Sequence, residues 1–176
     1  MSWDGVCESL CPIARALSVV GDRWTLLIMR ELMMGVRRFD DIQAQIGMSS
    51  HLLSTRLKRL EEDGVIERRL YNARPKRYEY LATEKGRALD PLILMLRSWG
   101  LTWGGYAPDD APAATLVHKQ TGELVDADWR PPTEGLQFSF DDVDATLSPA
   151  WAAEREADRV RFQNARKRRA TGIVAA

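Results

Sequence analysis

Residues 39–83 combine two short helical patterns, a glycine turn and an alternating basic segment without interruption. The first pattern, 39–46, places Ile42 and Ile46 on one face and ends at Gly47, where the chain can turn abruptly. A second pattern follows the sequence GMSS and stops at Gly64. Residues 65–71 and 77–81 then alternate apolar and polar side chains around an Asn- and Pro-containing turn at 72–76, which predicts a β-hairpin.

The second helical pattern has two chemically distinct faces. Ser49 suits its N-cap, and Met48 can pack against Leu53 across the first turn. At about 100° per residue, Leu53, Leu57 and Leu60 share one side. The opposite side carries hydrogen-bonding groups: His51, Ser54, Thr55, Lys58 and Arg59. Such groups reach base edges and phosphates, although a polar outer face is equally typical of any surface helix.

The hairpin supplies the charge that favours DNA. The whole chain has 25 Lys and Arg against 25 Asp and Glu, so its net charge gives no reason to expect nucleic acid. Between residues 49 and 78, however, there are eight basic and four acidic residues, a local excess of four positive charges. This excess could neutralise phosphates and release counterions, whereas the alternative is a hairpin with solvated Arg side chains. The pattern predicts a mainly α fold with a β-hairpin wing, a winged helix-turn-helix that reads double-stranded DNA.

Further helices flank this unit. Pro12 starts one that runs to Gly21, Asp22 caps the next, and residues 84–103 predict a single long helix. Because one helix in a groove reads only a few base pairs, specific binding requires two copies about 34 Å apart. The long helix carries an apolar stripe suited to joining them. Residues expected at the dimer interface or in a ligand pocket are Trp24, Leu92, Leu96, Trp99 and Trp103.

Several motifs in register resemble the HxlR-type winged helix-turn-helix transcriptional regulators. They are CPIARAL, GDRWTLLIMREL, the pair Arg38-Phe39, SSHLLSTRLKRLEEDGVIERRLY, and Trp99-Gly100 near the end of the matching region, 11–103. The resemblance implies a homodimer that binds a pseudo-palindromic operator, commonly as a repressor. Ser50 departs from the family, which often has Pro there, but Ser also suits a first helical position.

Carried onto this sequence, the resemblance assigns the recognition helix to 50–62 and the wing tip to 72–77. The DNA-binding residues it implies are Ser49, Ser50, His51, Ser54, Thr55, Lys58 and Arg59 on the helix, with Arg74, Lys76 and Arg77 on the wing. Arg37 and Arg38 are further candidates for contact with the DNA backbone. The wing is expected on phosphates or in a narrow minor groove, and the helix on base edges.

Two cysteines near the start of the chain raise the question of a signal. Cys11 coincides with a family cysteine that senses electrophiles or oxidants in some members. A helix N-terminus stabilises a thiolate, Arg15 could add to this, and Cys7 could act as the resolving thiol despite the nearby Glu8. The alternative is that both cysteines are inert. A small-molecule effector bound beside Trp24, Trp99 and Trp103 is the other signal we consider.

The rest of the chain predicts an extension. A Gly-, Pro- and Asp-rich stretch, 104–114, suggests a linker between a domain at 1–103 and a C-terminal piece at 115–176. That piece predicts short strands at 115–117, 124–125 and 136–140, and then a helix capped by Ser148 and opened by Pro149. Its basic end, ARKRRA, complements the helix dipole or, alternatively, binds phosphate. His118 has no cysteine near it, so we expect no zinc site.

Other classes of protein find little support in the sequence. It has no Gly-rich phosphate loop, no HExxH, no GxSxG and only two distant histidines, so we expect neither catalysis nor a cofactor. No apolar run is long enough to span a bilayer, which favours a soluble, cytoplasmic protein without a membrane partner. The expected partners are double-stranded DNA, a second copy and an effector. The alternatives are a sensor of aromatic compounds and a winged helix used only for protein contacts.

Overall fold

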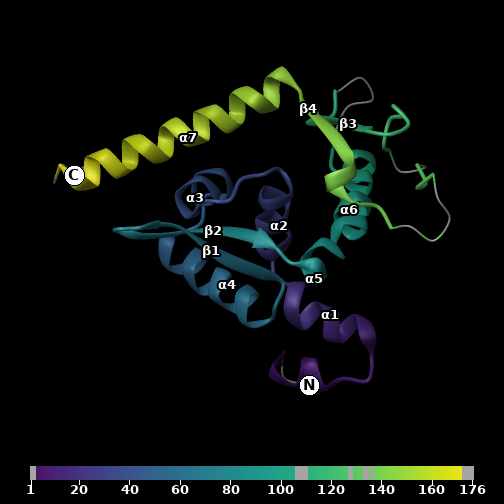
Figure 1. Cartoon of the computed structure of the whole chain (residues 1–176), viewed down its shortest axis with the longest axis horizontal. Coiled ribbons are helices and arrows are strands. Elements are labelled where there is room, and N and C mark those ends of the chain that lie inside the picture. The colour runs from purple at the N-terminus through teal and green to yellow at the C-terminus, as the bar shows by residue number, and fades with distance from the viewer. Residues whose placement is uncertain (1–2, 106–110, 127–128, 133–134, 136, 172–176) are drawn as a thin grey trace. The chain divides into compact units, whose positions relative to one another are not determined.

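The computed structural model describes residues 3–105, 111–126, 129–132, 135 and 137–171. The chain divides into two compact units, Met1–Gly86 and Arg87–Ala176 (Figure 1).

The first unit contains the predicted helix-turn-helix and hairpin. Its elements are the 3-10 helix η1 (Trp3–Glu8), α1 (Pro12–Val20), α2 (Thr25–Met33), α3 (Phe39–Ile46), α4 (Ser50–Glu62), β1 (Ile66–Ala73), β2 (Lys76–Ala82) and the short α5 (Glu84–Arg87) at its end. Strands β1 and β2 pair antiparallel from Ile66 opposite Ala82 to Ala73 opposite Lys76. The winged helix-turn-helix fold expected from the sequence is therefore confirmed.

One apolar core joins the helices of this unit to the hairpin. Its most deeply buried side chains are Ile28, Met29, Ile42, Leu53, Leu57, Leu60, Val65 and Ile66. They come from α2, α3, α4 and the start of β1, and Figure 1 shows α3 and α4 beside the hairpin. Because α4 contributes three of these side chains, its inner face is fixed and its outer face is presented to solvent.

The turn between α3 and α4 and the end of α4 have the predicted capping residues. Gly47 ends α3 with φ 69°, in the left-handed region that glycine adopts without steric cost. The Ser49 hydroxyl accepts a hydrogen bond from the Leu52 backbone N–H at 3.3 Å, so the expected N-cap is confirmed. At the other end, Gly64 has φ 68° and reverses the chain into β1.

The prediction of one helix over 84–103 is wrong. The structure has α5 (Glu84–Arg87) and α6 (Asp90–Trp103), separated at residues 88–89. Pro91 explains the break, because it lacks the N–H that a continuous helix would direct to the Arg87 carbonyl. Gly86 in α5 packs so closely that a Cβ there would lie 2.2 Å from the Val65 carbonyl oxygen.

The second unit contains α6 (Asp90–Trp103), β3 (Ala114–His118), the 3-10 turn η2 (Phe140–Asp142), β4 (Val143–Leu147) and α7 (Pro149–Ala170). Strand β3 confirms the strand expected at 115–117, and Leu124 forms a single bridge with Val117. The strand expected at 136–140 is wrong for its described part, which is irregular and then 3-10, while residue 136 lies outside the described residues. The actual partner of β3 is β4, which the sequence pattern missed.

A small core holds the second unit together. It consists of Leu94, Leu116, Val125, Phe138 and Val143, so α6 packs with the extension. Asp90 is only 1% exposed, and its carboxylate accepts hydrogen bonds from the Phe140 N–H at 2.9 Å and the Ser139 hydroxyl at 3.3 Å. Burial raises the pKa of Asp90 above its usual 3.8, although these two hydrogen bonds oppose the shift.

These contacts bear on the expected domain division. They place α6 in the same compact unit as the strands, whereas the sequence suggests a linker at 104–114. Part of that segment, 106–110, lies outside the described residues. Independent folding of 1–103 and 115–176 therefore stays a prediction.

The last helix begins as expected. The Ser148 hydroxyl accepts from the Trp151 N–H at 3.2 Å, and Pro149 occupies the first turn of α7. Among the described residues, no helix combines the length and apolar character needed to cross a membrane.

Candidate nucleic-acid interface

Helix α4 presents its polar residues outward as the sequence predicts. Leu53, Leu57 and Leu60 are buried beneath it. All seven candidate residues at this helix are exposed: Ser49, Ser50, His51, Ser54, Thr55, Lys58 and Arg59. A helix with such an outer face fits the major groove of B-DNA, where side-chain donors and acceptors meet base edges. The contacts themselves stay predictions.

Leu52 is an apolar residue of the outer face that the sequence reasoning missed. It is 52% exposed, although it stands next to the buried Leu53. The signal was available, because the helical spacing that groups Leu53 with Leu57 and Leu60 leaves Leu52 off their face. An exposed leucine on a reading helix can contact the methyl group of thymine.

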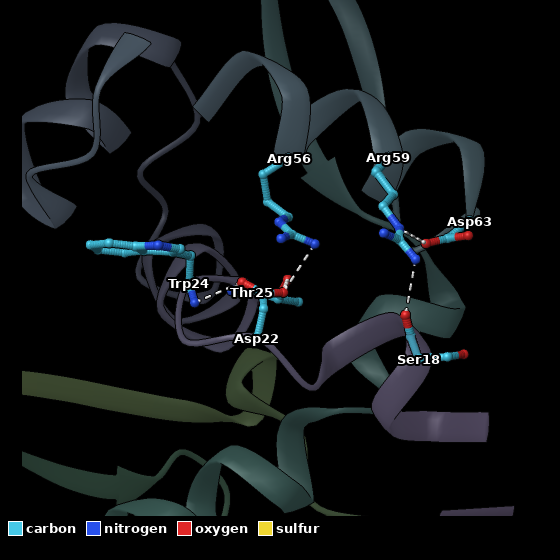
Figure 2. Close-up of polar contacts among 7 residues, drawn as sticks. All are labelled: Ser18, Asp22, Trp24, Thr25, Arg56, Arg59 and Asp63. Atoms are coloured by element: carbon cyan, nitrogen blue, oxygen red, sulfur yellow. Dashed lines mark hydrogen bonds and ion pairs between the residues drawn. The ribbon is translucent and has the colours of Figure 1, made fainter. Parts of the chain in front are cut away.

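An ion pair anchors α4 to the start of α2. The Arg56 guanidinium lies 3.1 Å from the Asp22 carboxylate, and both side chains are only about a quarter exposed, at 25% and 24% (Figure 2). Asp22 also accepts hydrogen bonds from the backbone N–H groups of Trp24 at 2.8 Å and Thr25 at 3.1 Å. The N-cap of α2 is Trp24, so the expected cap at Asp22 is wrong by two residues, because residues 23 and 24 form a turn before the helix begins. Asp22 instead holds that turn through the Trp24 and Thr25 N–H groups, and the same carboxylate fixes the middle of α4.

A second contact ties α4 to α1. Arg59 donates a hydrogen bond to the Ser18 carbonyl at 3.2 Å and lies 3.8 Å from the Asp63 carboxylate. Figure 2 shows Arg56 and Arg59 side by side, directed toward the chain that leads into α2 and toward α1. Arg59 is thus engaged within the protein, and its expected contact with DNA would need this guanidinium to serve both partners.

We predict that Asp22→Asn destabilises the first unit by about 1–2 kcal/mol, between the values typical of exposed and buried ion pairs. Asn keeps an oxygen for the Trp24 and Thr25 N–H groups, but it leaves the Arg56 charge without its carboxylate. Urea unfolding followed by Trp fluorescence measures the loss. The matched control is Glu62→Gln, which breaks the exposed Lys58–Glu62 pair and should change stability by less than about 0.5 kcal/mol. Equal effects would contradict the anchoring role.

The wing tip holds the hairpin's unpaired cations. Only residues 74 and 75 lie between β1 and β2, so the predicted turn at 72–76 is shorter than expected. Arg74, Lys76 and Arg77 are exposed, and no carboxylate of the described chain lies within ion-pair distance of them. A tight, basic loop of this kind can follow the phosphate backbone or enter a narrow minor groove.

Cations nearer the base of the hairpin are already paired. Arg68 lies 3.0 Å from Glu61 and stacks over the Tyr78 ring at 4.9 Å, while Arg69 lies 3.7 Å from Glu79. The local excess of positive charge predicted from the sequence is therefore concentrated at the tip. The sequence alone could not show this, because the pairing depends on which side chains the hairpin brings together.

The segment before α3 runs along β2. The Arg37 carbonyl accepts from the Tyr80 N–H at 2.8 Å, and the exposed Arg38 lies 3.5 Å from Glu79 and 4.6 Å from the centre of the Tyr71 ring. Both arginines therefore lie beside the wing. Their contact with the DNA backbone stays a prediction.

Both cysteines lie at the surface ahead of α1. Cys7 is in η1, and Cys11 occupies the N-cap position of α1, where the sequence places it. Arg15 does reach back toward this segment, but its guanidinium donates to the Cys7 carbonyl at 3.3 Å. Accessible thiols near a helix N-terminus suit a redox role, which stays a prediction.

Helix α6 exposes most of the predicted stripe. Leu92 and Leu96 are both exposed, and Trp99 and Trp103 are 63% and 71% exposed, whereas Ile93 is buried. Met95, which is also exposed, extends this apolar face. Trp24 belongs to the first unit and is half-buried, so its place in a shared interface or pocket stays a prediction.

The core, the capped α4 and the cationic wing define a winged helix-turn-helix protein of the class that regulates transcription. The sequence model described as HxlR-like helix-turn-helix matches residues 19–107. The chain belongs to this family, as its sequence motifs indicate.

Individual relatives agree with this assignment. The chain is 43% identical over 115 residues to the HTH-type transcriptional regulator Rv3095 of Mycobacterium tuberculosis, covering 65% of this chain and 71% of the relative. It is 38% identical over 98 residues to YvaP, an HTH-type transcriptional regulator of Bacillus subtilis, covering 54% of this chain and 91% of YvaP.

Two solved structures are similar as well. PA1607, described as a candidate transcription factor, matches with a TM-score of 0.62 and 33% identity over 81% of this chain and 97% of its own. The redox regulator HypR in its reduced form matches with a TM-score of 0.50 and 29% identity over 54% of this chain and 95% of its own. The likeness to HypR thus covers about half of the chain, whereas that to PA1607 covers much more.

Proposed function

We propose that the chain is a sequence-specific DNA-binding transcriptional regulator that acts as a homodimer, with repression as its mode. The observation that carries the proposal is the combination of a polar outer face on α4 with unpaired cations at the wing tip. The relatives named as transcriptional regulators support it, and the proposal assigns the chain no catalytic activity. A cytoplasmic location is part of the same proposal.

The two parts of the interface have different roles in this proposal. On α4, base edges are contacted by His51, Ser54, Thr55 and Lys58, and a thymine methyl by Leu52. Ser49 and Ser50 offer hydroxyl and backbone groups at the helix N-terminus, which suits a phosphate. Arg37, Arg38 and the wing tip bind the backbone and set the register of the helix on the duplex.

A homodimer is proposed because α6 leaves a continuous apolar face exposed. Monomeric proteins rarely expose such faces, and two winged helices are needed to read two half-sites one helical turn apart. A second copy of α6 would cover the face and fix the spacing between the recognition helices.

The signal has two candidates. A redox signal is favoured by the exposed thiols ahead of α1 and by the similarity to HypR, which is named a redox regulator. A small apolar or aromatic molecule is the alternative, bound at the dimer face of α6 together with Trp24. Either signal acts by changing the relative stability of dimer arrangements that bind the operator differently.

Binding to DNA from the region upstream of the chain's own gene tests the proposal. A labelled duplex from that region should bind at least about a thousandfold more tightly than a shuffled duplex of equal length and composition. Fluorescence anisotropy at about 50 and 200 mM salt should show a steep loss of affinity for both duplexes. Equal affinity for the two duplexes would rule out sequence-specific recognition of this DNA. If neither duplex binds, DNA is ruled out as the partner.

A further inference from the structure

Helix α7 separates its charges along its length. Its acidic residues, Glu154, Glu156 and Asp158, all lie in the first half. Its later basic residues are Arg159, Arg161, Arg166, Lys167, Arg168 and Arg169. No Asp or Glu occurs anywhere in 159–176, so a chain with zero net charge gathers six cations within eleven residues. Runs of like charge of this size often serve as interaction segments for polyanions.

The first two of these cations are used within the helix. Arg159 lies 2.9 Å from Glu156, and Arg161 lies 3.2 Å from Asp158. Lys167, Arg168 and Arg169, which we call the basic end of α7, are exposed. No carboxylate in the described part of the chain lies within ion-pair distance of these three side chains.

The basic end of α7 also lies beyond the part of the helix that contains half-buried residues. The half-buried positions of the helix are Trp151, Arg155, Asp158 and Phe162, a helical stripe that stops at Phe162. Every residue from 163 to 169 is exposed. With about 3.6 residues per turn, three consecutive cations there point in widely different directions around the helix.

The helix dipole accounts for only part of this arrangement. A cation in the last turn interacts favourably with the helix C-terminus, but neighbouring cations also repel one another. One or two basic residues would satisfy the dipole. A third consecutive cation without a carboxylate partner in the described chain, in a helix where Arg159 and Arg161 are paired, indicates a partner outside the fold.

We infer that the basic end of α7 is a second DNA-binding segment, which binds the phosphate backbone of duplex DNA next to the operator without reading its sequence. The choice of DNA as partner rests on the proposed function, and the charge complementarity is direct. Duplex DNA carries about one negative charge per 1.7 Å of its axis, and the long side chains of two or three of these cations can reach separate phosphates although they leave the helix in different directions. An anionic membrane fits less well, because the described residues just before the basic end, 163–166, carry no apolar side chain larger than that of alanine to insert into lipid.

The test compares two triple variants of the full chain. Lys167→Gln/Arg168→Gln/Arg169→Gln removes the basic end, and Arg155→Gln/Arg159→Gln/Arg161→Gln removes three cations of the same helix that are engaged by Trp151, Glu156 and Asp158. Anisotropy of a labelled 40-bp duplex of mixed sequence is measured over a range of KCl concentrations. The basic-end variant should flatten the plot of log K against log salt by about 2 to 3 per chain, and the control by less than about 1.

Several outcomes would overturn the inference. One is an equal change of slope in both variants, and another is no change in either. A third is weaker binding of the basic-end variant to phosphatidylserine vesicles or to single-stranded RNA with duplex binding unaltered. Far-UV circular dichroism should match between the variants, since the replaced side chains of the basic end are exposed.

Failure of the proposed function gives a different result from failure of this inference. If α4 does not read an operator, upstream and shuffled duplexes bind equally, and the basic-end variant still loses affinity for both. If the basic end does not bind DNA, the preference for upstream DNA persists in the variant, with its affinity and salt slope unaltered.

Discussion

Replacing Arg74, Lys76 and Arg77 with Gln should lower the affinity for upstream DNA by at least about a hundredfold at physiological salt. The reason is that these exposed wing-tip cations have no carboxylate partner in the described chain and are therefore available to phosphates. Six such contacts in a dimer correspond to about five released counterions, so the plot of log K against log salt should flatten by about five. Anisotropy titrations at several salt concentrations measure both quantities.

Arg68→Gln/Arg69→Gln is the control for the wing. It removes two cations from the same hairpin, but from side chains already paired with Glu61 and Glu79. Its slope should change by less than about one. If the wing-tip variant retains the wild-type slope, the wing does not lie on the phosphate backbone, and the recognition helix must bind without it.

The winged helix was predictable because its signals are local. Ser49, Gly47 and Gly64 mark the ends of α3 and α4, and the spacing of Leu53, Leu57 and Leu60 fixes the buried face. The same spacing identifies the outer face of α4, so the candidate recognition residues could be named before the structure was known. The spacing of apolar residues and the capping residues thus predict both the buried face and the exposed face of this helix.

Features that depend on distant contacts were not predictable in the same way. Strand β4 has the sequence VDATL, in which only Val143 is buried, so its identity depends on its pairing with β3. Likewise, the sequence gives no sign that Arg56 meets Asp22 or that Arg68 meets Glu61. The break between α5 and α6 does have a local signal, which is Pro91. The prediction of one helix follows the apolar spacing across 84–103 instead and therefore misses this break.

The second large effect concerns the apolar face of α6. Trp99→Ala/Trp103→Ala should convert a dimer into a monomer at micromolar concentrations. Trp99 and Trp103 are 63% and 71% exposed, so their loss costs the folded chain little, while a two-fold interface would lose four Trp side chains. Aromatic residues of this kind dominate interface energies, and a loss of at least about 4 kcal/mol raises the dissociation constant roughly a thousandfold.

Analytical ultracentrifugation over about 1–50 μM measures this change, and Leu124→Ala is the matched control. Leu124 is 63% exposed, the same as Trp99, but it lies outside α6. It should leave association unchanged. Loss of the dimer should also weaken binding to upstream DNA, because each half-site would then bind one winged helix without the entropic advantage of a linked second site. A double Trp variant that remains dimeric with wild-type affinity would show that α6 does not form the interface, and the spacing of the recognition helices would have to be set by another element.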